Sequence, residues 1–102
     1  MQDKILRKFF LGFVQIHILH HGKQEPFYGS WMRDELIGHG YDVSPGTLYP
    51  ILKNMTRDGL LEKEARNVNG KIRKYYKTTP LGIEVLNNAK EKAYELFHEL
   101  KD

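Results

Sequence analysis

The feature that most constrains the fold of this chain is an Asn-Gly pair, Asn69-Gly70, between two short runs typical of β-strands, residues 60–66 and 71–77. Asn-Gly favours the type I′ turn, whose twist matches that of two antiparallel strands, so this stretch predicts a β-hairpin. The segments on both sides of the hairpin carry helix signals instead. The sequence therefore predicts a mostly helical α+β fold with one hairpin near its middle.

The helix signals define four segments by their caps, their proline and glycine punctuation and their apolar spacing. We expect helices over about 3–20, 28–37, 44–58 and from 79–80 to near the C-terminus, with Trp31, Met32 and Leu36 facing inward in the second. The third begins at Ser44-Pro45, with Ser as the cap and Pro in the first turn. The order helix, helix, helix, hairpin, helix predicts a winged helix-turn-helix.

Length and composition exclude several classes of protein. The chain has 102 residues, enough for one domain, and it has no cysteine, which rules out disulfide scaffolds and thiolate metal sites. Lys4, Arg7 and Lys8 precede an apolar run, as in a signal peptide, but Gln15 and His17 interrupt that run before it is long enough to span a membrane. We expect a cytoplasmic protein with no membrane partner.

The positive charge is concentrated in the middle of the chain. The formal net charge is +3, yet residues 44–77 carry eight basic and three acidic side chains, a net of +5. A basic segment of this kind indicates a polyanionic partner. Within it, the third helix turns Leu48, Ile51, Leu52 and Met55 to one side. The opposite side carries Gly46, Pro50, Lys53 and Arg57. Pro50 removes a bond from the helix interior, and we interpret this as a bend that directs the first turn into the major groove.

Three motifs resemble the PadR-like family of bacterial and archaeal transcriptional regulators. They are residues 44–52 (SPGTLYPIL), 58–61 (DGLL) and 73–82 (RKYYKTTPLG), and the similarity extends over roughly residues 10–100. The resemblance implies a winged-helix homodimer that binds operator DNA, usually as a repressor released by a small molecule. Family members often have His-Gly-Tyr where this chain has Tyr28-Gly29-Ser30, so a phosphate contact carries over to Ser30 or Tyr28.

The residue pattern and the resemblance together give a set of DNA-binding candidates on the second helix, the recognition helix and the hairpin. They are Tyr28, Ser30, Ser44, Pro45, Gly46, Thr47, Tyr49, Lys53, Arg57, Lys71, Arg73 and Lys74. The hairpin cations could instead only protect the edge of a sheet, but their position after a basic amphipathic helix favours DNA.

The last helix has a seam of apolar residues at heptad spacing, which is typical of helix pairing between chains. The resemblance adds the first helix to the same interface. The candidates for a homodimer contact are Phe9, Phe10, Phe13, Leu86, Ala89, Ala93, Leu96, Phe97 and Leu100. We therefore divide the chain into a DNA-binding domain, residues 1–79, whose first helix (about 3–20) is also in the dimer interface, and a dimerisation helix, residues 80–102, in the same compact unit.

Other functions have less support in the sequence. His17, His20 and His21 have a spacing that could hold a metal, but no carboxylate or cysteine nearby in the sequence completes a set, so we expect no metal and no cofactor. No glycine-rich phosphate loop, activated nucleophile or paired carboxylates indicate an enzyme. The alternatives left open are a winged-helix module for protein–protein contact without its own operator, and a small-molecule sensor with weak DNA affinity.

Overall fold

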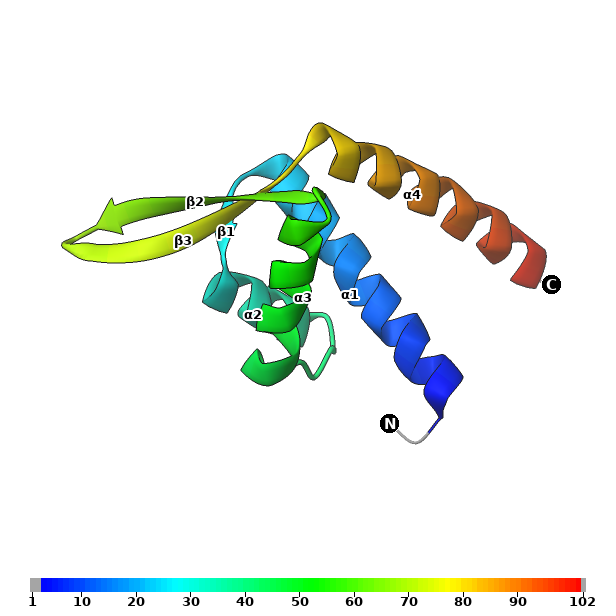
Figure 1. Cartoon of the computed structure of the whole chain (residues 1–102). Helices are drawn as coiled ribbons and strands as arrows, with labels where there is room; N and C mark the ends of the chain where they lie inside the picture. The colour runs from blue at the N-terminus through cyan, green and yellow to red at the C-terminus, as the bar shows by residue number, and fades with distance from the viewer. Residues whose placement is uncertain (1–2, 102) are drawn as a thin grey trace.

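The computed structural model describes residues 3–101, so the predicted boundaries at residues 1 and 102 lie outside the described residues. Its elements follow the predicted order with one short strand added (Figure 1). They are α1 (Lys4–Gln24), β1 (Phe27–Tyr28), α2 (Gly29–Gly38), α3 (Pro45–Arg57), β2 (Leu61–Val68), β3 (Lys71–Thr78) and α4 (Pro80–Leu100). The mostly helical α+β winged-helix prediction is confirmed.

Side-chain caps fix where three of the helices begin, as the sequence predicts. The Asp3 carboxylate accepts from the backbone N–H of Ile5 at 2.8 Å, and the Ser44 and Thr79 hydroxyls cap α3 and α4. The end of α1 differs from the prediction. Four residues that we expected to lie in a loop, 21–24, extend the helix to Gln24.

The hairpin has the predicted turn, because Asn69 and Gly70 both adopt positive φ, 53° and 82°. β3 pairs with β2 on one side and with the two-residue strand β1 on the other, in the order β1-β3-β2 and antiparallel throughout. β1 was not predicted, since two residues carry no readable alternation. It matters because it connects the base of the hairpin directly to the start of α2.

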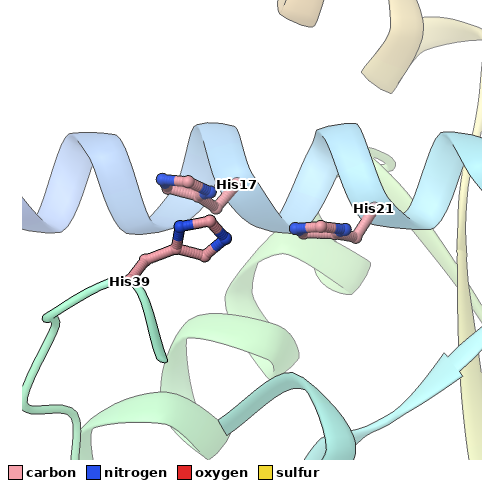
Figure 2. Close-up of side chains that lie close together, drawn as sticks. All are labelled: His17, His21 and His39. Atoms are coloured by element: carbon pink, nitrogen blue, oxygen red, sulfur yellow. The ribbon is translucent and has the colours of Figure 1, made fainter. Parts of the chain in front are cut away.

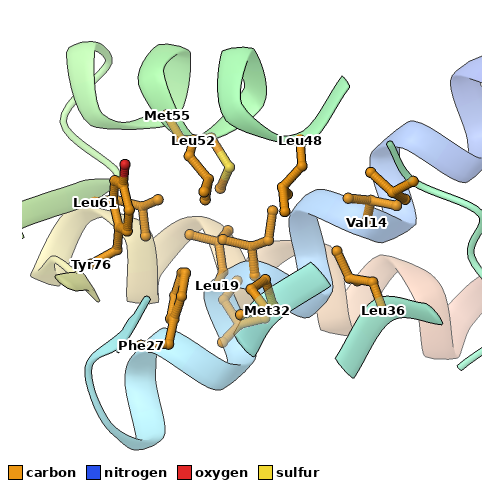
Figure 3. Packing of buried hydrophobic residues seen from close by; sticks show 13 residues of the cluster. Val14, Leu19, Phe27, Met32, Leu36, Leu48, Leu52, Met55, Leu61 and Tyr76 are labelled. Carbon is orange, nitrogen blue, oxygen red and sulfur yellow. The ribbon is translucent and has the colours of Figure 1, made fainter. Parts of the chain in front are cut away.

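The core lies where α1, α2, α3 and the base of the sheet meet (Figure 3). Ile18, Met32, Leu36, Leu48 and Leu52 are fully buried there. The prediction that Trp31 faces inward is wrong. The indole is on the surface edge-to-face with His21, while the neighbouring Met32 takes the inward position.

Two elements extend away from this core in different directions. The tip of the β2–β3 hairpin projects on one side, and most of α4 runs out on the other, beside α1 (Figure 1). α4 is anchored at its start, where Gly82 lies against the Leu60 carbonyl and the Thr78 side chain, and where Leu86 is buried. Within residues 3–101, no helix is long and apolar enough to cross a membrane.

Candidate nucleic-acid interface

The outward side of α3 is free to meet a ligand. Leu48, Leu52 and Met55 bury one side of the helix, and the predicted outer residues Gly46, Pro50, Lys53 and Arg57 are all exposed. The Ser44 hydroxyl accepts from the Thr47 backbone N–H at 3.2 Å and donates to the Thr47 hydroxyl at 3.2 Å. The Thr47 and Leu48 N–H groups also donate to the Ser44 carbonyl, and Pro45 has no N–H. The donor left in the first turn, at the positive end of the helix dipole, is therefore the Gly46 N–H.

A close contact between Tyr49 and Gly29 fixes the position of the Tyr49 ring. A Cβ added at Gly29 would lie 2.6 Å from Tyr49 Cε1 and 2.8 Å from its hydroxyl oxygen, so only glycine leaves room for the ring. The Tyr49 side chain is otherwise 46% exposed. The backbone at the start of α2 thus acts as a support that holds an exposed phenol beside the recognition helix. Sequence reasoning identified Tyr49 but missed Gly29.

The hairpin cations are partly organised by stacking on aromatic rings. The Arg73 guanidinium lies 4.1 Å from the centre of the Tyr28 ring, and Arg66 lies 4.4 Å from that of Tyr75. Arg66 and Arg73 are also directly opposite each other in the β2–β3 register. Two like charges at such positions destabilise a hairpin, and the carboxylate of Glu64, whose Oε1 lies 3.2 Å from Arg66 Nε, offsets part of the repulsion.

The pleat of β3 divides the predicted wing contacts between two faces. Alternate residues point to opposite sides of a strand, so Lys71 and Arg73 share a face with Tyr75, and Lys74 shares the other with Tyr76. Tyr76 is buried toward the core, whereas Lys74, nearer the tip, is exposed. The sequence predicted Lys71, Arg73 and Lys74 as wing contacts without dividing them, and the strand geometry places them on two faces.

Arg33 holds the connection between α2 and α3 in place. Its Nε donates to the Val43 carbonyl at 2.9 Å, across the turn that Gly40 allows with its φ of +91°. The angle between the two helices of the helix-turn-helix unit therefore depends on a side chain that the sequence did not single out. An arginine bonding ten residues ahead leaves no local sequence signal.

The predicted DNA-binding residues form a surface that runs from α3 across the start of α2 to the hairpin. Ten of the twelve are exposed, and Tyr28 and Thr47 are half-buried. Arg57 is paired with Asp58 at 3.2 Å on the surface, a contact of small energy that leaves its charge available.

A second surface is a long apolar groove between α1 and α4, with a volume of about 810 Å³. Most of the predicted dimer-interface residues line it: Phe9, Phe13, Leu86, Ala89, Ala93, Leu96, Phe97 and Leu100. Two of the predicted interface residues are not available at the surface of the groove. Phe10 points away from the groove and packs edge-to-face on Tyr41 at 6.0 Å, and Leu86 is already buried in the core of its own chain.

A carboxylate that is distant in the sequence comes close to the first-helix histidines. Folding brings Glu35 Oε1 to 3.5 Å from His21 Nε2 and 3.2 Å from His39 Nε2, so the expectation that no carboxylate lies near these histidines is wrong. His20 is not part of this group. Its Nε2 lies 3.3 Å from Gln24 Nε2 instead.

The helix pair α2–α3, the tight turn between them and the basic β2–β3 hairpin define a winged helix-turn-helix of the DNA-binding class. Comparison with known proteins gives the family. The sequence profile of the transcriptional regulator PadR-like family matches residues 18–88. The chain is 43% identical over 95 residues to the transcriptional regulator Rv3488 of Mycobacterium tuberculosis, which covers 93% of this chain and 89% of that protein.

Solved structures agree with the sequence comparison. The PadR-like transcriptional regulator of Bacillus cereus superposes with a TM-score of 0.84 at 30% identity, covering 92% of this chain and 93% of that one. A PadR family regulator from Eggerthella lenta gives a TM-score of 0.82 at 30% identity, with 95% and 86% covered. The chain belongs to the PadR-like family of transcriptional regulators, which are DNA-binding proteins rather than enzymes.

Proposed function

We propose that this regulator binds operator DNA with α3 in the major groove and the β2–β3 hairpin as a wing on the phosphate backbone. The observation that carries the proposal is the continuous exposed surface formed by the outer side of α3, Tyr49 on its Gly29 support, and the Tyr28–Arg73 stack. The small side chains at the start of α3 let its backbone approach the duplex, and the Gly46 N–H binds phosphate. Lys53, Arg57 and Lys71 add charge along the same path, and Lys74 adds charge on the opposite face of the hairpin.

We propose further that a second copy of the chain covers the α1–α4 groove. Leu96, Phe97 and Leu100 are 48%, 61% and 70% exposed, and such a row of large apolar side chains is costly to leave in water. Residues 1–79 would then form the DNA-binding unit and residues 80–102 the dimerisation helix. A two-fold axis between the copies places two recognition helices about 34–36 Å apart, one turn of DNA.

In this scheme the protein is a repressor, and a small molecule that enters the groove changes the angle between the two recognition helices and releases the DNA. The aromatic and aliphatic lining of the groove favours an apolar effector. A regulator of this kind acts where the chromosomal DNA lies, in the cytoplasm.

The first experiment is a binding titration of the full chain against the DNA upstream of its own gene, at several salt concentrations, with an unrelated duplex as the control. We expect tight binding to the first duplex and weak binding to the second. Equal, strongly salt-dependent binding to both would contradict an operator. No binding to either at low salt would favour a winged-helix module for protein contact.

A pair of variants tests the wing. Lys71→Ala combined with Arg73→Ala, which removes two cations from one face of β3, should reduce the magnitude of the salt slope of binding by about 1.8 for each wing, because each lost phosphate contact removes about 0.9. Lys4→Ala combined with Lys101→Ala removes the same charge from exposed positions at the outer ends of α1 and α4 and serves as the matched control. If both double variants change the slope equally, only net charge matters and the wing does not contact the backbone.

A further inference from the structure

Three histidines, two from α1 and one from the C-cap of α2, meet beside the helix-turn-helix. His17 and His21 lie one turn apart on the same side of α1, and His39 follows the last residue of α2 (Figure 2). One ring nitrogen from each lies within 4.8 Å of the others. The rings are arranged around a common space, with centroids 4.8 Å apart for His17 and His39 and 6.3 Å apart for His21 and His39.

The backbone explains why His39 reaches this place. Its N–H bonds to the carbonyls of Glu35 and Leu36 at 3.2 and 3.1 Å, which holds it at the C-cap of α2. Leu36 is fully buried and packs α2 into the same core as Ile18 of α1, so the end of α2 is held against the turn of α1 that carries His17 and His21. The cluster is therefore a product of the rigid core.

A carboxylate lies beside two of the three rings. Glu35 lies one turn before His39 on α2, and its Oε1 is within 3.5 Å of a ring nitrogen of both His21 and His39. An ion pair with Glu35 accounts for the approach of these two rings. It does not account for His17, which contacts the other rings instead.

The pKa values of His17 and His21 are shifted toward the neutral form of the ring. Burial is the main cause that lowers the pKa of His17 and His21 below the ordinary value of 6.5. The neighbouring histidines lower it further in both rings, and the Glu35 carboxylate opposes the shift, most strongly for His21. Neutral imidazole is the form that coordinates a metal.

We propose that His17, His21 and His39 bind a divalent transition metal ion of the zinc class, with Glu35 as the fourth ligand. A tetrahedral site with metal–nitrogen bonds of about 2.0–2.1 Å needs nitrogens about 3.3 Å apart. From at most 4.8 Å, the nitrogens close this gap by small rotations of partly exposed side chains. Imidazole and carboxylate ligands favour Zn²⁺, Co²⁺ or Ni²⁺, and the lack of cysteine disfavours softer ions such as Cu⁺.

The position of the site gives the metal a specific mechanical effect. It would join α1, which lines the groove, to the end of α2, the first helix of the helix-turn-helix. His17 itself borders both the cluster and the groove. Metal binding would therefore fix the recognition unit relative to the helix proposed to meet the second chain.

The test uses the full chain without a polyhistidine tag, stripped with EDTA and dialysed. Titration with Co²⁺ should give the visible absorption of a four-coordinate ion, saturating at one ion per chain, and calorimetry with Zn²⁺ should give the same stoichiometry. Zn²⁺ at one hundred times its dissociation constant should raise the Tm by roughly 10 °C, the shift expected of a ligand that binds only the folded state of a small domain.

Two variants separate this site from a chelate on the surface of α1. His39→Gln should abolish the cobalt band and the thermal shift, and it should leave the circular dichroism spectrum unchanged because His39 is exposed. His20→Gln is the matched control on α1, and it should bind as the natural protein does. The proposal is overturned if the natural protein does not bind Co²⁺ and Zn²⁺, if His39→Gln binds normally, or if His20→Gln abolishes binding. Because no arm of the test uses DNA, its result is independent of the proposed operator binding.

Discussion

The contact between Gly29 and Tyr49 gives a sharp test of how the recognition surface is built. In Gly29→Ala, the new methyl group would lie 2.6 Å from Tyr49 Cε1, whereas carbon atoms in contact prefer about 3.5–4.0 Å. The ring therefore has to withdraw by about 1 Å. Because Tyr49 is half exposed, it can swing toward solvent, and the core beneath it is not disturbed.

The substitution should separate stability from DNA affinity. Gly29 is the first residue of α2 and has no positive φ, so alanine gains up to about 1 kcal/mol of helix propensity, which offsets the strain, and the Tm should change little. A hydrogen bond from the phenol to a phosphate, worth about 1.5–3 kcal/mol, does not survive a displacement of 1 Å. Operator affinity should fall by about tenfold to a hundredfold for each recognition helix.

Fluorescence anisotropy on the operator duplex measures the effect, with two controls. Gly38→Ala makes the same change in the same helix, where the added Cβ meets nothing within 4 Å, and it should not affect binding. In a Tyr49→Ala background, Gly29→Ala should have no further effect, because the residue through which it acts is gone. The reasoning is refuted if Gly29→Ala binds normally, or if it weakens binding equally with and without Tyr49.

Two further predictions concern the groove and the anchor of α4. Leu96→Glu should raise the dissociation constant of the homodimer at least about tenfold in sedimentation equilibrium, because it places a charge in the apolar groove. Leu81→Glu is the control, because Leu81 is on the same helix and also 48% exposed but lies outside the groove, and it should leave the dissociation constant unchanged. Equal effects of the two substitutions would contradict this interface. Gly82→Ala should destabilise the chain by about 2 kcal/mol or more in denaturant unfolding, because the methyl group would collide with the Leu60 carbonyl, which cannot rotate away. Gly38→Ala is the neutral comparison, and a similarly stable Gly82→Ala would show that the start of α4 is looser than described.

The parts of the fold that the sequence predicted are those decided by local physics. The caps at Asp3, Ser44 and Thr79 and the Asn69-Gly70 turn each depend on the conformational preferences of a few adjacent residues. The heptad seam of α4 also depends on local physics, since it follows from helical periodicity alone. The residues of the seam line the α1–α4 groove, which confirms that they share one side of the helix.

The parts that the sequence did not predict depend on contacts between distant segments. Trp31 and Met32 are both apolar neighbours on a short helix, and only the packing against α1 decides which one enters the core. The approach of Glu35 to His21 depends on the docking of two helices, so spacing along α1 could not reveal it. Likewise, the use of Gly29 as a support for Tyr49 is visible only once β1 has placed α2 beside α3.

The exposed apolar half of α4 has a consequence for how the protein responds to its own abundance. If only the paired form reads an operator, then below the pairing constant the active species grows with the square of the chain concentration, and doubling synthesis gives about four times as much of it. Gene control by such a chain would switch over a narrow range of expression level. The steepness of that response would be set by a few leucines and one phenylalanine far from the DNA.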